Sequence, residues 1–334
     1  MSDVRVLTER DLRDVITLDR NVVDAMGRAF VALSRGVVAM PPVLRLNVAR
    51  YNGEIDVKTA FLPEVAHIAV KISPGYFDNP RIGLRSLNGL MVVLHANTGI
   101  VAAILLDNGY LTTLRTAAAG AAAADALARR NARSVAVLGG GEQAWEQVQA
   151  VRLVRPIEQV RVWARRPDAA RAIAARLAGA TGMRASAFDD AREAVTKADI
   201  VLTTTPSREP ILKAEWLMPG QHVTAVGADA SYKNELEPEV VSRADCYVPD
   251  CLSQCRELGE LRAAIAAGEV PGERAFLELG HVLAGDAPGR RNDCDITVCD
   301  LTGTGAQDTM IADLALARAV AKGAGVEIDS GGHP

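Results

Sequence analysis

Hydrophobic positions follow a helical period near the start of the chain and a strand-like period after it. Between residues 3 and 40, apolar side chains recur at helical spacing, among them Val22, Met26 and Leu33, so this stretch predicts helices. From residue 43 onward, short β-type runs are separated by turn signals such as Tyr51-Asn52-Gly53. The expected strands are 43–48, 55–61, 68–72, 90–95 and 101–107, which predicts a mostly antiparallel sheet or partial barrel.

From residue 111 the pattern changes to helices that alternate with short apolar strands. We expect helices over 112–129, within 139–153 and over 168–178, and strands over 134–138, 159–163, 200–204 and 222–226. Such alternation is typical of a parallel sheet covered by helices. A terminal helix is expected over 310–322, followed by a Gly-rich, frayed tail over 323–334.

A glycine-rich turn carries the first candidate chemistry. Gly139-Gly140-Gly141-Glu142-Gln143-Ala144 fits the pattern G-x-G-x-x-A, and it follows an apolar strand and opens a helix. Gly139 permits a tight turn, Gly141 lets the backbone approach a pyrophosphate, and Ala144 allows close packing of helix on strand. The pattern favours a dinucleotide site over an empty βα turn. The predicted fold class is α/β: a Rossmann-type parallel-sheet domain plus a mixed α+β domain.

The strand over 159–163 bears on the choice of dinucleotide. It ends without the acidic residue that would bind a ribose 2′-hydroxyl, and Arg165 and Arg166 follow instead. The two arginines could meet a 2′-phosphate, or they could simply be solvated before a helix that begins with proline. The expected cofactor is therefore NAD(H) or NADP(H), with the choice left open.

Composition and charge exclude several classes of protein. The 334 residues are enough for about two domains. The formal charge is −4 and no basic block occurs, so no nucleic-acid partner is expected. The sequence shows no signal-peptide pattern and no long uncharged apolar run, which predicts a cytoplasmic protein without a membrane partner. The histidines lack metal-ligand spacing, so no metal is expected, and the five cysteines are interpreted as reduced thiols.

Five motifs together resemble the ornithine cyclodeaminase/mu-crystallin family. In the family's order they are Leu111-Thr112-Thr113-Leu114-Arg115-Thr116-Ala117-Ala118-Ala119, Thr205-Pro206-Ser207-Arg208-Glu209-Pro210, Ala225-Val226-Gly227-Ala228-Asp229, Gly259-Glu260-Leu261, and Thr302-Gly303-Thr304-Gly305-Ala306-Gln307-Asp308. The resemblance spans residues 40–320. It implies a dimer of two-domain α/β subunits, with a substrate-binding and dimerisation domain (1–115 with 310–334) and a dinucleotide-binding domain (116–309).

The resemblance also implies roles for individual residues. Lys71 and Asp229 match the catalytic residues, and Arg45 matches the arginine that binds the substrate carboxylate. Arg115 is expected on the cofactor phosphates and within reach of the substrate. The full set of implied cofactor contacts is Thr112, Arg115, Gly139, Gly141, Glu142, Gln143, Ala164, Arg165, Arg166, Thr204, Thr205, Val226, Gly227, Thr302 and Gly303.

Two residues depart from the usual family pattern and both add positive charge. Lys58 stands where many members have methionine, and Arg85 replaces a proline. A substrate with two carboxylates needs a second cationic contact, because a buried unpaired carboxylate is costly. Ser86 and Asn88 could add hydrogen bonds. The alternative is that Lys58 and Arg85 are ordinary surface charges.

A narrower branch of the family, that of the ectoine-utilisation cyclodeaminases and iminosuccinate reductases, is similar to this chain around Lys71-Ile72-Ser73-Pro74-Gly75. The prediction is an NAD(P)H-dependent imine reductase that reversibly converts iminosuccinate to L-aspartate. One alternative is an ornithine cyclodeaminase, for which Glu54 or Asp56 would hold the distal amine. A second alternative is a non-catalytic, crystallin-like NAD(P)H-binding protein.

Overall fold

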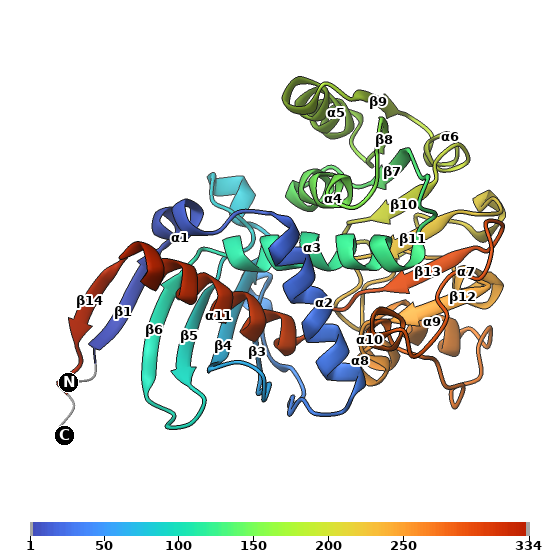
Figure 1. Ribbon diagram of the computed structural model, residues 1–334. Coiled ribbons are helices and arrows are strands. Elements are labelled where there is room, and N and C mark those ends of the chain that lie inside the picture. The colour runs from blue at the N-terminus through green and yellow to red at the C-terminus, as the bar shows by residue number, and fades with distance from the viewer. Residues whose placement is uncertain (1–2, 332–334) are drawn as a thin grey trace. The chain divides into compact units, whose positions relative to one another are not determined.

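The computed structural model describes residues 3–331, which form two compact units (Figure 1). Among the described residues, unit 1 comprises 3–115 and 304–331, and unit 2 comprises Thr116–Gly303. The chain therefore returns to unit 1 at Thr304 rather than at residue 310. His333 lies outside the described residues.

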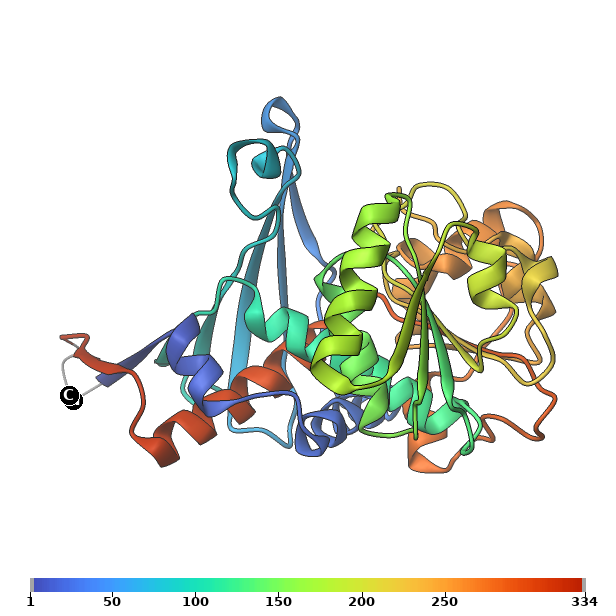
Figure 2. The same ribbon diagram turned by 90° about the horizontal axis from the view of Figure 1, so that it is seen from above.

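Unit 1 is built on an open, mixed sheet. Its strand order is β14-β1-β6-β5-β4-β3-β2, and only β1 and β6 pair in parallel. The strands are β1 (Asp3–Thr8), β2 (Leu44–Val48), β3 (Gly53–Ala60), β4 (His67–Tyr76), β5 (Leu90–His95), β6 (Val101–Leu106) and β14 (Val326–Asp329). Figure 2 shows the β2–β3 turn and the short helix η2 (Asn79–Ile82) at the same end of this sheet.

Both ends of the described chain correct the prediction. Residues 3–8 form strand β1 instead of a helix, because β1 pairs with β6 on one side and with β14 on the other. Residues 326–329, expected to be frayed, form β14. Partners far away in sequence decide these two strands, and a local hydrophobic pattern does not reveal such partners.

Helices cover one face of the unit 1 sheet, while the other face remains partly open. The helices of this unit are α1 (Glu9–Val15), α2 (Arg20–Ser34), the start of α3 (Tyr110–Leu127), and α11 (Gly305–Lys322), which crosses β5, β4 and β3 (Figure 1). Side chains on the covered face, such as Ala69, Met91 and Leu105, are fully buried. On the opposite face Leu44 and Leu46 are more than half exposed.

Unit 2 contains a parallel sheet with the order β12-β13-β11-β10-β7-β8-β9. Its strands are β7 (Ser134–Leu138), β8 (Gln159–Trp163), β9 (Arg184–Phe188), β10 (Ile200–Thr203), β11 (His222–Ala225), β12 (Cys246–Pro249) and β13 (Thr297–Asp300). The order reverses between β7 and β10, and ligands of open parallel sheets bind at such a point, beyond the carboxyl ends of the strands. This confirms the predicted fold class.

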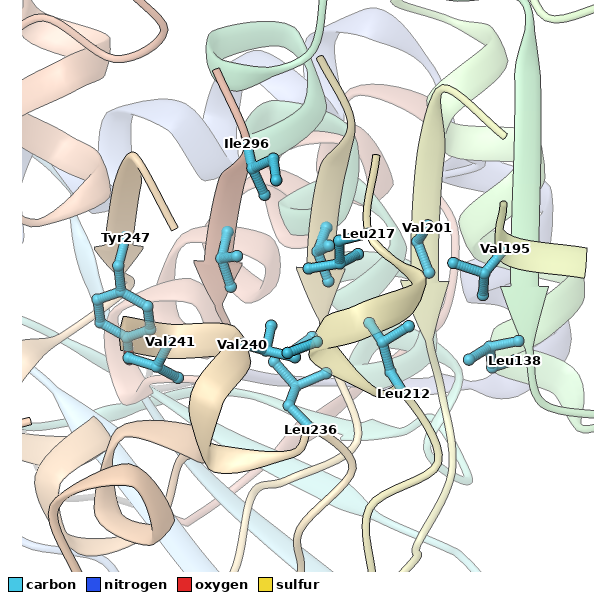
Figure 3. Close-up of a cluster of buried hydrophobic side chains, with 14 of the residues drawn as sticks. Leu138, Val195, Val201, Leu212, Leu217, Leu236, Val240, Val241, Tyr247 and Ile296 are labelled. Atoms are coloured by element: carbon cyan, nitrogen blue, oxygen red, sulfur yellow. The ribbon is translucent and has the colours of Figure 1, made fainter. Parts of the chain in front are cut away.

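Two hydrophobic layers enclose the unit 2 sheet. On one face α4 (Glu142–Arg152), α5 (Pro167–Thr181) and the end of α3 pack on β7, β8 and β10. The other face is covered by α6 (Ala191–Val195), η3 (Ala214–Trp216), α7 (Pro238–Arg243) and α9 (Glu260–Ala266). Figure 3 shows Val195 of α6 and Val240 and Val241 of α7 in this layer. The remaining short helices are η1 (Ala49–Tyr51), α8 (Leu252–Glu257) and α10 (Leu279–Ala284).

Candidate active site

Two buried lysines lie side by side on the covered face of the unit 1 sheet. Lys71 is opposite Lys58 in the β3–β4 pairing, and the two residues are only 2% and 8% exposed. The strand period places alternate residues of β4 on the same face, so Lys71 lies on the face of buried Ala69. Lysines are almost never fully buried unless they have a partner, so this pair indicates a specialised site.

The partner of Lys71 comes from α11. An Asp308 carboxylate oxygen lies 2.8 Å from Lys71 Nζ, and the other lies 3.1 Å from Arg115 Nε. Asp308 is fully buried. Its position depends on where the helix begins: Thr304 and Gln307 form a capping box, so α11 begins at Gly305 rather than at the predicted residue 310. Lys58, Lys71, Arg115 and Asp308 are called the cationic cluster below.

The ionisation of this cluster is set by burial and by the neighbouring charges. Burial lowers the pKa of Lys71 to about 8, although the Asp308 charge raises it; Arg115 and Lys58 lower it further by repulsion. Burial alone would raise the pKa of Asp308, but the charges of Lys71 and Arg115 outweigh burial and lower it. Asp308 is therefore ionised at neutral pH, while Lys71 can release its proton near neutral pH.

The other predicted substrate residues lie in different surroundings. Arg45 shares the covered face by register, and its guanidinium grips Asp56 at 2.6 and 2.7 Å. Arg85 is exposed, 3.7 Å from Glu9. Ser86 accepts a hydrogen bond through its carbonyl from Tyr76, and the Asn88 side chain accepts one from Gly89. The structure thus brings Lys58, Lys71 and Arg115 together, whereas Arg85 is exposed and contacts Glu9.

The glycine turn of unit 2 fits a dinucleotide on two structural grounds. Gly139 has a φ of 154°, and a Cβ there would lie 2.1 Å from Thr204 Oγ1, so only glycine fits where β7 meets β10. A Cβ on Gly141 would meet no heavy atom within 4 Å, and no side chain caps α4. Open space above uncapped helix N–H groups is what a pyrophosphate requires.

The residues around this turn are mostly exposed. Glu142 forms an ion pair with Arg176 at 3.0 Å, and the Gln143 side-chain oxygen accepts a hydrogen bond from Gln147. Beyond β8, Ala164 is buried whereas Arg165 and Arg166 are exposed. Thr112, the remaining predicted phosphate contact, is half-buried in the first turn of α3.

Glu235 anchors the predicted cofactor segments that follow β10 and β11. It is fully buried and accepts hydrogen bonds from Thr203 Oγ1 and from Thr205 N and Oγ1 at 2.5–2.7 Å. The Gly227 N–H donates to it at 2.7 Å. Burial raises the pKa of Glu235, although these hydrogen bonds oppose the effect. Val226, the other predicted contact here, is buried beside Gly227.

A second buried carboxylate holds the predicted nicotinamide segment. Asp250 accepts hydrogen bonds from the backbone N–H groups of Thr302 and Gly303 at 2.8 and 2.9 Å. The Glu260 carboxylate in turn accepts hydrogen bonds from the backbone N–H groups of Glu235 and Leu236. The carboxylates Glu235, Asp250, Glu260 and Asp300 are called the acidic cluster.

Asp229 lies beyond β11, as predicted for a residue after a parallel strand. Its side chain is 47% exposed, and a carboxylate oxygen lies 2.5 Å from Lys233 Nζ, four residues along the chain. Among the residues that the structure describes, no group of three or more His, Cys, Asp or Glu side chains could hold a metal ion. In residues 3–331 no helix is long and apolar enough to cross a membrane.

Sequence reasoning missed Asp308, Glu235 and Asp250 as members of these sites, and it also passed over the buried Asp107. Asp308 ends one of the five recognised motifs, so that motif was the signal available for it. Asp107 is 1% exposed, and burial raises its pKa, which the nearby Lys71 charge opposes. No pattern in the sequence distinguishes it from a turn aspartate before Asn108-Gly109.

Comparison with known proteins gives full-length matches. The sequence profile of the ornithine cyclodeaminase/mu-crystallin family matches residues 3–323. A protein of Rhizobium meliloti (strain 1021), named as a dehydrogenase without a stated substrate, is 54% identical over 330 residues, 99% of this chain and 100% of that protein. An uncharacterised cyclodeaminase of Sinorhizobium fredii is 52% identical over 331 residues, with the same coverage.

Solved structures agree over nearly the whole chain. An archaeal alanine dehydrogenase dimer with bound NAD has a TM-score of 0.91 and 32% identity, with 98% of this chain and 99% of that chain covered. The iminosuccinate reductase of Paracoccus denitrificans with NAD⁺ has a TM-score of 0.89 and 29% identity, also with 98% and 99% coverage.

Proposed function

Because the chain belongs to the ornithine cyclodeaminase/mu-crystallin family, we propose that it is a nicotinamide-dependent imine reductase that converts iminosuccinate to L-aspartate and also works in reverse. The cationic cluster is the observation that carries this choice. Lys58, Lys71 and Arg115 lie around the single carboxylate of Asp308, and all four are buried. Their formal charges leave an excess of positive charge, which an anionic substrate would neutralise.

The geometry of the cluster favours a substrate with two carboxylates. Lys71 and Arg115 are linked through Asp308, so they would hold the α-carboxylate, with Arg45 on the same sheet face. Lys58 lies one strand away and would meet the distal carboxylate. Because buried charges need opposite partners, the cationic cluster disfavours the distal ammonium of ornithine. Glu54 and Asp56, the candidates for holding that ammonium, both lie within 4 Å of Arg45.

The unit 2 turn would hold the dinucleotide. The N–H groups at the start of α4 would bind its pyrophosphate, Arg165 and Arg166 would lie by the ribose, and Thr302–Gly303 would lie against the nicotinamide. Bound there, the dinucleotide supplies a hydride to, or takes one from, the carbon that bears nitrogen. As the family resemblance implies, we assign Asp229 the role of supplying or relaying the proton of the substrate nitrogen. Lys233 holds the Asp229 carboxylate in place through a hydrogen bond.

A spectrophotometric assay tests the reaction. Oxaloacetate with excess ammonia forms iminosuccinate, and oxidation of NADH and of NADPH is followed in parallel at 340 nm. We expect ammonia-dependent oxidation that is lost in Lys71→Ala and Asp229→Ala. If no oxidation occurs and L-ornithine with NAD⁺ yields proline, the protein is a cyclodeaminase and the proposal is wrong.

The assignment of Lys58 to the distal carboxylate has its own test. We expect Lys58→Met to lower kcat/KM for oxaloacetate plus ammonia by roughly 10–100-fold relative to pyruvate plus ammonia, since one charge-assisted contact contributes about 1.5–3 kcal/mol. Arg85→Met should change this ratio less. Arg81→Met, an exposed arginine on the same turn, is the matched control. An unchanged ratio in Lys58→Met would remove the support for a dicarboxylate.

We also propose a cytoplasmic homodimer that forms through unit 1. The outer face of its sheet carries the exposed apolar side chains Leu44 and Leu46, and the related alanine dehydrogenase is a dimer. All five cysteines are free thiols, which suits a reducing compartment. Leu46→Asp should convert the dimer to a monomer in light scattering, whereas Leu153→Asp, an exposed leucine of unit 2, should not.

A further inference from the structure

Asp107 is a buried carboxylate with an unused oxygen. It follows β6 and is 1% exposed. One oxygen accepts a hydrogen bond from Leu111 N at 2.9 Å, in the first turn of α3. The other oxygen, Oδ1, is buried and has no hydrogen-bond partner. A buried polar atom without a partner is costly and needs an explanation, and capping α3 uses only half of this side chain.

The strand register places Asp107 on the same sheet face as the cationic cluster. Lys71 pairs with Met91, which pairs with Leu105, and Asp107 lies two residues beyond Leu105. Burial follows the same alternation, because Leu105 and Asp107 are buried while Leu106 is 41% exposed. Burial raises the pKa of Asp107, while backbone hydrogen bonds from the turn that follows it and then the Lys71 charge oppose that rise.

Two further features belong to the same side of the sheet. Gly89 lets the turn before α3 lie close to the backbone that precedes β5, since a Cβ on Gly89 would lie 3.4 Å from Gly109 N. α3 then brings Arg115 to Asp308. Ser73, two residues after Lys71 on β4, also has a buried hydroxyl oxygen without a hydrogen-bond partner. Unused polar atoms thus occur where the positive charges gather, which is the pattern of a ligand site.

We propose that Asp107 binds the nitrogen of the substrate, as a catalytic residue additional to Asp229. This inference rests on the proposed function, because it takes the ligand to be an amino or imino acid. Lys71 and Arg115 attract the carboxylates, and Asp107 Oδ1 accepts a hydrogen bond from the ammonium or iminium N–H. Asp107 thereby distinguishes an amino acid from a carboxylic acid of the same shape.

Calorimetric binding in the presence of NAD⁺ tests the contact without turnover. The ligands are L-aspartate and succinate, which lacks the nitrogen. Asp107→Asn keeps an oxygen for the Leu111 N–H but presents an N–H₂ group to the ligand nitrogen. We expect it to weaken L-aspartate at least tenfold and to change succinate less than about twofold, since a hydrogen bond to a charged group is worth roughly 1.5–3 kcal/mol. Asp190→Asn, at the cap of α6, should change neither affinity.

Equal losses for both ligands, or no loss, would show that Asp107 only caps α3 and would overturn the inference. A second pair, L-alanine and propionate, separates this failure from failure of the proposed function. The wild type could bind neither dicarboxylate but bind L-alanine more tightly than propionate, with Asp107→Asn removing that difference. In that case the assignment of aspartate as substrate is wrong and the role of Asp107 stands. If the wild type prefers no amino acid to its nitrogen-free analogue, both proposals are wrong.

Discussion

The two units bury charge in opposite ways. In unit 1 the cationic cluster gathers like charges, because Lys58 and Arg115 both repel Lys71 and only Asp308 lies between two of the cations. In unit 2 the acidic cluster gathers carboxylates, yet their oxygens accept hydrogen bonds from the N–H groups of the adjoining loops. Asp300 Oδ1 is the one carboxylate oxygen of that cluster without such a bond.

Under our proposal, this difference separates buried charges that bind a ligand from buried charges that hold the fold. The carboxylates Glu235 and Asp250 are saturated by the segments they hold, so they serve to position Thr205, Gly227 and Gly303. Near the cationic cluster, in contrast, atoms of Asp107 and Ser73 lack hydrogen-bond partners. A saturated cluster stabilises the fold by itself, whereas an unsaturated one is completed by what it binds.

Removing the one carboxylate of the cationic cluster should have the largest effect. Asp308→Asn removes the carboxylate that pairs with Lys71 and Arg115, and breaking a buried ion pair costs about 3–5 kcal/mol. We expect urea unfolding to show a loss of that order, and activity to fall at least 100-fold. Succinate should restore part of the stability, because it replaces the lost negative charge. Asp313→Asn on the same helix is the control; equal effects in both variants would contradict the special role of Asp308.

The acidic cluster should respond mainly through cofactor binding. Glu235→Ala leaves the donors of Thr205 and Gly227 unpaired, which we expect to cost about 2–3 kcal/mol of unfolding free energy. KM for the nicotinamide cofactor should rise about tenfold while kcat changes less, because the loops that hold it lose their anchor. Glu235→Gln should recover part of both, and Glu237→Ala serves as a neighbouring control. A fall in kcat with unchanged KM would show that Glu235 does not act through cofactor binding.

A smaller effect, the pH dependence of the free energy of unfolding, should have opposite signs for the acidic and the cationic cluster. The folded pKa of Asp300 is raised, chiefly by burial, to about 7 from an ordinary 3.8. Between these values the folded state keeps a proton that the unfolded state releases, so the free energy of unfolding falls as pH rises, by at most about 1.4 kcal/mol per pH unit. Asp300→Asn should remove this slope in urea titrations between pH 5 and about 7.

Lys71 should give the opposite slope at higher pH. Burial lowers its folded pKa to about 8 from 10.5, so above pH 8 the folded state releases a proton that the unfolded state still holds. The free energy of unfolding therefore rises with pH in that window. Lys71→Met should flatten the rise. If Asp300→Asn flattened it instead, the attribution of the two slopes would be reversed.

The sequence was most informative for elements whose structure depends only on residues within the same short segment. The glycine turn at Gly139 and the strands β5, β7 and β8 were predicted with the bounds that the structure shows, because turn chemistry and a short apolar run are local features. β1 and β14 were missed, and α11 was expected to begin at residue 310 rather than at Gly305. The two strands form by pairing across the chain, and the helix begins earlier because of the Thr304 capping box.

The candidate site divides in the same way. Sequence alone determined the α/β class and the dinucleotide turn, and it named Lys71 and Lys58 as candidates, because glycine patterns and charged residues in strands can be read from a linear sequence. Only the tertiary structure decided that Lys71, Lys58, Arg115 and Asp308 meet, and that Arg85 is exposed and contacts Glu9. The physical reason is that burial and charge pairing depend on contacts between distant segments, such as β4 and α11, whose partners the sequence does not specify.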